Sequence, residues 1–376
     1  MTVGTTSPAI PPVLHGISDF RTGLHAWLDA NDLTPAPDHS LDGQVAQLLR
    51  VRRALFDADW MRYGWPTEIG GLGGPAALRA VLGEQIATRD LAEPGIWSMI
   101  EVLAPTMIAY ARPELAATMV PLLLSGREQW CQGFSEPGSG SDLASLSTKA
   151  TQHGDGWVIS GQKVWTSLAQ YAARCVLLAR TGPGHEGISA FFVDMDSPGI
   201  TVRPLRTMHG VDEFAEVFFD DVAVPADRLL GNPGDGWRIA MDLLPYERST
   251  CFWHRIAYLF TRLDQVLAQT DSGDDATLGA AYLALHTVRC RSLGTQRRLA
   301  AGARIGPETS IDKVLLATAE QQLFDIARDL LPGVVELDDG PWRTEFLYSR
   351  AATIYGGTAE IQRNIIARRL LDLGKE

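Results

Sequence analysis

The chain has 376 residues, of which 45% are hydrophobic and 21% are charged. These values are typical of a globular protein with one large domain or two to three small ones. The formal net charge of −12 argues against non-specific nucleic-acid binding, which needs a basic surface. No apolar run approaches the ~20 residues that cross a bilayer, so we expect no membrane span.

The four cysteines are scattered among apolar neighbours without C-x-x-C spacing. We therefore expect reduced, buried thiols rather than disulfides or a metal site. The first residues lack the charged and apolar regions of a signal peptide. Together these features predict a cytoplasmic protein without a bound metal.

Apolar spacing predicts helices through the first third of the chain. Val45, Leu48 and Leu49 recur at near-helical intervals, and an apolar helix ends before Gly126. The Gly-rich segment 64–74 interrupts this region. We assign residues 1–128 to an N-terminal helical domain.

Short β-type segments separated by turn signals follow. The expected strands cover 157–160, 175–179, 188–193 and 215–222. They predict a small antiparallel β-barrel domain over residues 129–232.

Helical periodicity returns in residues 233–376. We expect helices from Gly236, over 278–300, over 310–331 and over 353–373, with an acidic break at 271–275 and Gly374 as a C-cap. The predicted fold class is therefore α+β, with an N-terminal helical domain, a central antiparallel β-barrel domain and a C-terminal four-helix-bundle domain.

Residues 130–167 contain the most informative pattern. Residues 134–142 read F-S-E-P-G-S-G-S-D, and 161–167 read G-Q-K-V-W-T-S. The glycines let a backbone approach a ligand closely, and the serines add hydrogen-bonding groups. Trp165 offers a flat apolar surface, with Ser167 two residues on along the same strand face. Each piece alone is usually just a turn or a core residue, but together they suit a flavin nucleotide.

This two-part pattern resembles the flavin-binding segment of the acyl-CoA dehydrogenase family. The run G-W-P-T-E-I-G-G at 64–71 resembles a second family motif, and the resemblance covers most of the chain. It implies an FAD-dependent enzyme that oxidises an acyl-CoA thioester between its α and β carbons, with flavin N5 as hydride acceptor. It also implies a role in fatty acid or sterol side-chain catabolism, with an electron-transfer flavoprotein or similar protein as electron acceptor.

The resemblance also assigns cofactor contacts. It places Phe134 and Ser135 at the flavin pyrimidine and Trp165, Thr166 and Ser167 at the ring and its N5 atom. The remaining assigned positions are Gln132 beside the ring, Gly140 and Ser141 near the phosphates and the substrate's pantetheine, and Thr358 and Glu360 at the far half of the cofactor.

The position of the catalytic base departs from many family members. Those members carry a glutamate in a C-terminal Y-E-G-T motif, where this chain has Gly356. Isovaleryl-CoA and long-chain acyl-CoA dehydrogenases instead carry the base on a bundle helix before an arginine, which matches Glu247 and Arg248. A glycine at 356 clears space for a carboxylate from another helix and leaves its N–H to bind the thioester oxygen. Tyr246 and Tyr355 flank these positions and are predicted to contact the substrate, as is Ser141.

The non-catalytic interpretation of Glu247 is that it is a solvated helix glutamate beside an arginine. Its helix neighbours at i−4, i−3 and i+4 are apolar (Leu243, Leu244 and Cys251), which favours burial. Two other functions stay open: a catalytically silent partner subunit, and a flavin oxidase or monooxygenase on the same fold.

Two family elements that hold the flavin of a neighbouring subunit are missing. The chain has neither the R-x-x-F-G segment nor the Q-x-x-G-G-x-G run. The run I-Y-G-G-T-A-E-I-Q-R-N-I-I at 354–366 resembles bacterial heteromeric, steroid-degrading members of the family. The sequence thus predicts a homo- or hetero-oligomer, and in the second case a related subunit completes the site.

Overall fold

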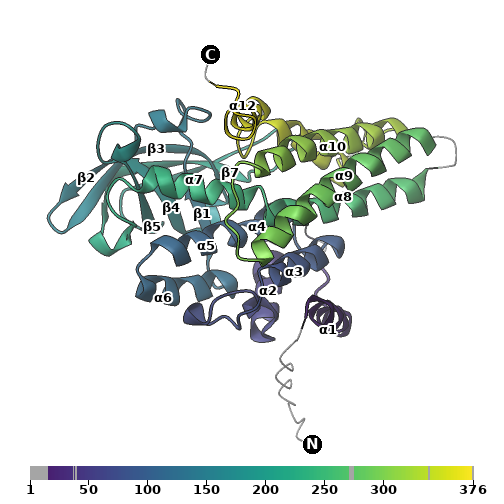
Figure 1. The fold of residues 1–376 in the computed structure, drawn as a ribbon, viewed down its shortest axis with the longest axis horizontal. Coiled ribbons are helices and arrows are strands. Elements are labelled where there is room, and N and C mark those ends of the chain that lie inside the picture. The colour runs from purple at the N-terminus through teal and green to yellow at the C-terminus, as the bar shows by residue number, and fades with distance from the viewer. Residues whose placement is uncertain (1–15, 37, 39, 271–274, 338, 375–376) are drawn as a thin grey trace, which may run out of the picture.

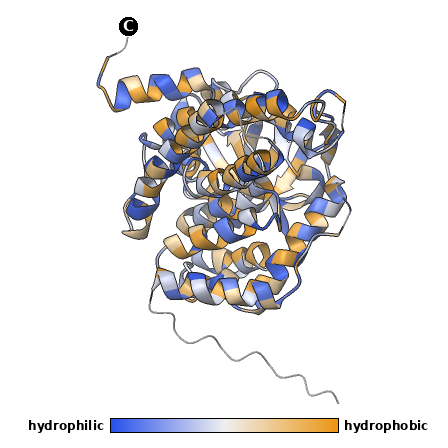
Figure 2. Cartoon of the chain, turned by 90° about the vertical axis from the view of Figure 1, so that its right-hand side faces the viewer, coloured by the Kyte–Doolittle hydropathy of each residue, from blue (hydrophilic) through white to orange (hydrophobic). Residues whose placement is uncertain are grey.

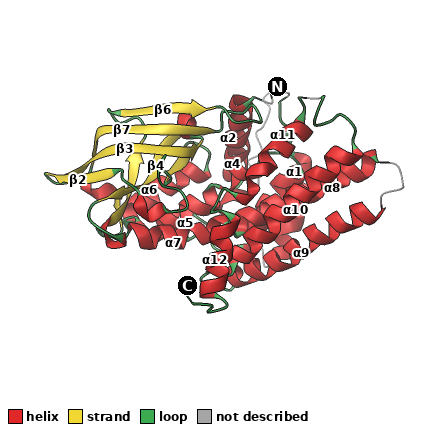
Figure 3. Ribbon diagram, turned by 90° about the horizontal axis from the view of Figure 1, so that it is seen from above, coloured by secondary structure: helices red, strands yellow, loops and turns green. Residues whose placement is uncertain are grey.

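The computed structural model describes residues 16–36, 38, 40–270, 275–337 and 339–374. Strands gather at one end of the molecule, and helices form the rest (Figure 1). Seen from above, the sheet lies beside the helices rather than between two helical layers (Figure 3). The predicted acidic break at 271–275 falls almost wholly outside the described residues.

The N-terminal part is helical, as predicted. Ser40 caps the second helix because its side chain accepts a hydrogen bond from the Gly43 amide at 3.1 Å. Gly126 ends the region at φ +64°, a left-handed value that glycine adopts without strain. The helices are α1 (Ile17–Ala30), α2 (Leu41–Asp57), α3 (Ala77–Thr88), α4 (Pro94–Ser98), α5 (Ile100–Tyr110) and α6 (Pro113–Leu124).

The central part is one eight-stranded sheet, and all four predicted strands lie within it. Its strand order is β6-β7-β3-β2-β4-β5-β8, with β1 paired to β4. The two ends of this path are not paired with each other in the described residues, and β1 and β2 pair with β4 in parallel. The sheet is therefore mixed and open, where we predicted an antiparallel barrel. The strands are β1 (Gln129–Gly133), β2 (Lys149–His153), β3 (Gly156–Ser167), β4 (Ala172–Arg180), β5 (Ile188–Asp194), β6 (Ile200–Leu205), β7 (Phe214–Val224) and β8 (Leu229–Leu230).

The C-terminal part is a helical bundle in which α8, α9 and α10 run side by side (Figures 1 and 3). Its helices are α7 (Gly236–Glu247), α8 (Thr250–Gln269), α9 (Asp275–Ala300), α10 (Thr309–Leu330), α11 (Pro341–Ser349) and α12 (Ala359–Arg369). The helix predicted over 353–373 is shorter, because Gly356 and Gly357 at φ +62° and +91° form a turn before α12. Gly374 has φ +61° but follows that helix by several residues.

Short 3-10 helices connect these elements, and the described residues contain seven of them. They are η1 (Trp60–Arg62), η2 (Thr67–Ile69), η3 (Leu143–Ser145), η4 (Ala169–Tyr171), η5 (His185–Gly187), η6 (Ala226–Arg228) and η7 (Arg350–Thr353).

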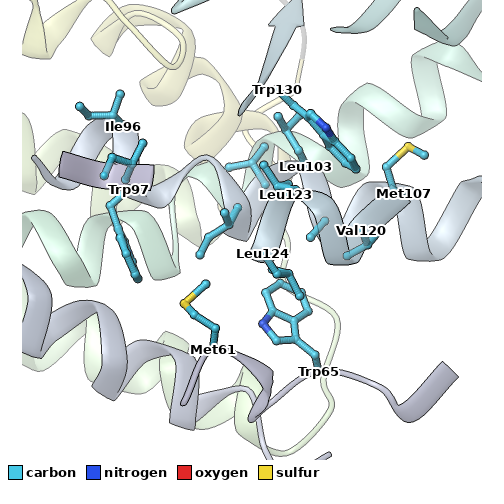
Figure 4. Packing of buried hydrophobic residues seen from close by; sticks show 14 of the residues in the cluster. Met61, Trp65, Ile96, Trp97, Leu103, Met107, Val120, Leu123, Leu124 and Trp130 are labelled. Carbon is cyan, nitrogen blue, oxygen red and sulfur yellow. The ribbon is translucent and has the colours of Figure 1, made fainter. Parts of the chain in front are cut away.

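The largest apolar core joins the N-terminal helices to the sheet and to α7. Trp65, Trp97 and Trp130 are among its largest buried side chains (Figure 4). Individual helices carry both hydrophilic and hydrophobic residues (Figure 2), as expected for elements with one buried face. In the described residues, no helix has the length and hydropathy that crossing a membrane requires.

Candidate active site

Glu247 ends α7 and meets the Gly356 turn. A Cβ atom added to Gly356 would stand 2.9 Å from Glu247 Oε1, closer than real Cβ contacts allow. The carboxylate thus occupies the space that any larger side chain at position 356 would need. The structure brings together the two positions that the sequence coupled.

Two buried cations surround this carboxylate. Arg248 Nε donates to the Gly356 carbonyl at 3.0 Å, and Lys313 Nζ donates to the Ala352 carbonyl at 2.5 Å. Lys313 is 2% exposed, and its ammonium lies 3.9 Å from the centre of the Tyr355 ring. Both cations therefore tie the turn that carries Gly356 to α7 and α10.

Glu247 is half-buried, and burial and the two neighbouring cations shift its pKa in opposite directions. Burial raises the pKa of the Glu247 carboxyl, and the Arg248 and Lys313 cations act to lower it. Burial also lowers the pKa of Lys313 to about 8, although Glu247 favours its charged form. A carboxylate in this setting is a stronger base than one in water and still has cations that favour its ionised form.

Tyr355 and Tyr246 flank the pair but differ in their contacts. Tyr355 packs between the Lys313 ammonium and the Tyr348 ring, whose centroid lies 5.8 Å away. Tyr246 is half-buried, and its carbonyl accepts a hydrogen bond from Ser249 Oγ at 2.8 Å. Tyr355 is thus part of the wall beside Glu247.

The Gly/Ser loop is held by a buried ion pair. Glu136 Oε1 lies 2.8 Å from Lys163 Nζ, which also donates to the Phe134 carbonyl at 3.1 Å. Burial alone would raise the pKa of Glu136, but the Lys163 charge and hydrogen bonds from Lys163, Thr148 and Ser147 lower it to about 2. This brace fixes the loop against the middle of β3.

The loop leaves open space on its outer side. Nothing lies within 4 Å of a Cβ built on Gly138 or Gly140, and Gly140 and Ser141 are exposed. Phe134 is buried, whereas Gln132 and Ser135 are half-buried. The Ser135 carbonyl accepts from the Val164 amide at 2.9 Å, which joins the loop to the strand that carries Trp165.

The end of β3 presents an open aromatic ring. Trp165 is 59% exposed and has φ +59°. Its ring packs edge-on against the Phe214 ring, with 5.9 Å between the two ring centroids. The β3–β7 pairing shifts between Lys163 and Thr166, so a bulge interrupts the simple alternation expected from sequence. Thr166 is fully buried, and its Oγ1 has no hydrogen-bond partner in the described residues. An open indole, an unpartnered hydroxyl and the half-buried Ser167 fit the edge of a planar heteroaromatic such as flavin.

Thr358 and Glu360 lie outside this group. The Thr358 hydroxyl caps α12 by accepting from the Ile361 amide at 3.2 Å. Glu360 is exposed and lies 3.9 Å from Arg363. Among the described residues, no hydrogen bond or ion pair joins these two side chains to the elements around Glu247, and their assignment to the cofactor stays a prediction.

Sequence reasoning missed Lys313 and Gln362. Gln362 is buried and donates to the carbonyls of Gly356 and Gly357, each at 3.2 Å. A lysine on the apolar face of the predicted helix 310–331 was a usable signal, because lysine is almost never fully buried without a partner. Gln362 carried no comparable signal.

Comparison with known proteins decides the family. The family model described as "Acyl-CoA dehydrogenase, middle domain" matches residues 131–222. The model described as "Acyl-CoA dehydrogenase, C-terminal domain" matches residues 234–371. The acyl-CoA dehydrogenase IpdE1 of Mycobacterium tuberculosis is 37% identical over 385 residues, covering 96% of this chain and 99% of that protein. The chain belongs to the acyl-CoA dehydrogenase family. It is an oxidoreductase of that class, so the predicted enzyme class and the three-part fold are confirmed.

Other relatives agree. The human mitochondrial short-chain specific acyl-CoA dehydrogenase is 29% identical over 81% of this chain and 78% of its own. The ChsE4-ChsE5 complex of Mycobacterium tuberculosis has a TM-score of 0.80, 26% identity and full coverage of both chains. The steroid acyl-CoA dehydrogenase Tcur3481-Tcur3483 has a TM-score of 0.83 at 23% identity, covering 96% and 97%, and shows the shared fold.

Proposed function

We propose that this chain binds FAD and oxidises an acyl-CoA thioester to the 2-enoyl-CoA, with Glu247 as the base. The observation that carries the proposal is the fit of the Glu247 carboxylate into the space left by Gly356. A solvated helix glutamate would not be aimed at a glycine turn between two buried cations. The raised pKa of Glu247 has burial as its main cause, which is the usual way to strengthen a carboxylate base.

In the proposed reaction Glu247 removes the α-proton, which moves onto its carboxylate oxygen. The C–H electrons form the new α,β double bond as the β-hydrogen leaves with its electron pair. A bound flavin supplies the acceptor for that hydride, at its N5 atom. Arg248 and Lys313 keep Glu247 ionised before the transfer and hold the turn that faces it.

The thioester oxygen gains negative charge as the α-proton leaves, and it needs donors. The Gly356 amide has no acceptor among the described residues, so its N–H is available for this oxygen. The same turn thus makes room for the base and offers one of the donors. Tyr355, packed against Lys313, limits how that turn can move.

The FAD assignment is supported by the open geometry at the Gly/Ser loop and at the end of β3. Trp165 would provide a surface for the ring, Ser167 a donor toward N5, and Ser135 and the Phe134 backbone contacts at the pyrimidine. The Lys163–Glu136 brace holds both segments in register. Family members are FAD-dependent flavoproteins, which agrees with this fit.

Anaerobic mixing of the purified flavoprotein with a panel of acyl-CoAs tests the function. We expect the flavin absorbance to bleach and one equivalent of enoyl-CoA to form. When air is then admitted, the reduced protein should form peroxide no faster than free reduced flavin does. Acyl-CoA binding without bleaching would indicate a silent subunit. Rapid, stoichiometric reoxidation by oxygen would indicate an oxidase and contradict the proposed use of an electron-transfer protein as acceptor.

A further inference from the structure

The turn at Gly356 and Gly357 brings two backbone carbonyl groups close together. Both residues have left-handed backbone conformations, at φ +62° and +91°. Their carbonyl oxygens each lie 3.2 Å from the same atom, Nε2 of Gln362. Two acceptors that converge on one point repel each other unless a donor lies between them. This conformation of the turn therefore depends on a hydrogen-bond donor.

Gln362 supplies that donor from the start of α12. Its side chain is fully buried, and its Oε1 atom has no hydrogen-bond partner among the described residues. The two hydrogen bonds to the turn are thus the interactions that offset the burial of this amide. A reversed amide would place Oε1 against two carbonyl oxygens, so the turn selects the orientation in which nitrogen faces it.

Each glycine of the turn makes room for a different side chain. A Cβ atom on Gly356 would stand 2.9 Å from Glu247 Oε1, and a Cβ atom on Gly357 would stand closer still to Gln362 Nε2. Real Cβ atoms do not approach other atoms so closely. Gly356 therefore makes room for the proposed base, and Gly357 makes room for Gln362, whose amide packs directly on the backbone of the turn.

The chain on either side of the Gly356 amide is held by different groups. Before it, the Tyr355 amide donates to the Ala351 carbonyl at 3.0 Å. After it, the Gly356 carbonyl accepts from Arg248 Nε at 3.0 Å as well as from Gln362. Glycine adopts positive and negative φ with similar ease, so Gly356 alone does not select its left-handed conformation. Gln362 bonds the carbonyls of both glycines, and it thereby fixes the turn across both of them.

We propose that Gln362 is a positioning residue, which holds the Gly356–Gly357 turn so that the Gly356 N–H faces the thioester oxygen. The inference rests on the proposed function and adds a residue that acts through the turn. Without its donor the two carbonyls repel, either glycine can rotate, and the Gly356 amide turns away. Displacing a preorganised donor of this kind by about 1 Å can slow a reaction by about 100-fold.

The test uses Gln362→Met, which removes the donor at similar side-chain length, and Gln362→Glu, which keeps the shape and replaces the donor with an acceptor. Two ligands that do not reduce the flavin separate positioning of the donor from general damage. One is the 2-enoyl-CoA product, and the other is the matching S-alk-2-enyl-CoA thioether, which lacks the carbonyl oxygen. The dissociation constant of each ligand and the rate of flavin reduction at saturating acyl-CoA are measured for every variant.

We expect flavin reduction to slow by roughly tenfold to 100-fold in both variants at position 362. The enoyl-CoA should bind about threefold to tenfold more weakly, which corresponds to the loss of one hydrogen bond. The affinity for the thioether should stay at its wild-type value, because that ligand has no oxygen for the Gly356 N–H. A residue with a merely structural role would weaken both ligands alike.

Gln321→Met is the matched control, because Gln321 is also a glutamine of the bundle and donates to the Ser349 carbonyl at 3.1 Å. It should keep the wild-type reduction rate and both affinities. Flavin content and circular dichroism show which variants fold, and one folded variant at position 362 decides the question. Equal weakening of both ligands, or wild-type rates and affinities, overturns the inference while the proposed function stands. If no acyl-CoA reduces the wild-type flavin, the proposed function fails and this inference fails with it.

Discussion

At the scale of single residues, the ionisation of Glu247 is balanced between burial and two cations. A base acts when it is deprotonated, so kcat/KM should rise with pH through the pKa of Glu247. Removing the positive charge of Lys313 removes an effect that lowers this pKa. Without that charge the pKa of Glu247 is therefore higher, and the rise of kcat/KM with pH moves to higher pH.

Lys313→Met is expected to shift the acidic limb of the kcat/KM profile upward by about one pH unit, the usual size of a close-charge effect. Lys313→Arg keeps the charge and should leave the limb near its wild-type position. The profile is measured by steady-state kinetics across the pH range in which both variants keep their flavin. If the acidic limb of the profile is unchanged in Lys313→Met, Lys313 does not affect the pKa of Glu247, and its role is only to bind the Ala352 carbonyl.

At the scale of elements, the turn between η7 and α12 is the part that makes the site possible. Gly356 combines φ +62° with the close approach of Glu247, so a side chain there meets backbone strain and displaces the Glu247 carboxylate. The turn also takes the place of the first residues of the helix that periodicity predicts over 353–373, so that α12 begins only at Ala359. The spacing of apolar residues indicates which face of a helix is buried. It does not detect a two-glycine turn, which depends on the local backbone conformation.

Gly356→Ala should lower kcat by at least tenfold and destabilise the protein by about 1–2 kcal/mol, the cost of a left-handed residue with a Cβ. Gly374→Ala is a matched control, because Gly374 has φ +61° with nothing within 4 Å of its Cβ position. The control should show a similar or smaller stability change and full activity. Thermal unfolding and steady-state rates are the measurements, and equal rates in the two variants would contradict the role of the turn.

At the scale of the whole molecule, sequence was informative where structure is local or the motif is long. The sequence predicted the three-part fold, the four strands and the proximity of Glu247 to Gly356. The parallel pairing of β1 with β4 and the bulge at Trp165 could not be predicted, because each depends on contacts between distant segments. Lys313 was within reach, since its burial on an apolar helix face requires a partner.

The assembly is the other whole-molecule question. The chain lacks two sequence elements to which the family resemblance assigns the binding of a neighbour's flavin, and one structural relative is a complex of two different chains, ChsE4-ChsE5. We propose a hetero-oligomer in which a related subunit supplies those elements. Leu370, Leu371 and Leu373 near the C-terminus are exposed in the isolated chain and are available for subunit contact.

The chain expressed alone should carry clearly less than one flavin per polypeptide, and co-expression with the related subunit should raise that ratio. Absorbance of released flavin against protein concentration gives the number, and light scattering gives the assembly. A stable homomer with one flavin per chain would rule out an obligate partner. Activity of that homomer would also show that the missing elements are not needed.

The most direct test of the account is the reductive half-reaction of Glu247→Gln. With FAD bound as in the wild type, anaerobic addition of a good acyl-CoA substrate should bleach the variant's flavin about 10²–10⁴-fold more slowly than that of the wild type, which is the usual contribution of a general base. Bleaching of Glu247→Gln within a few-fold of the wild-type rate would show that another group removes the α-proton.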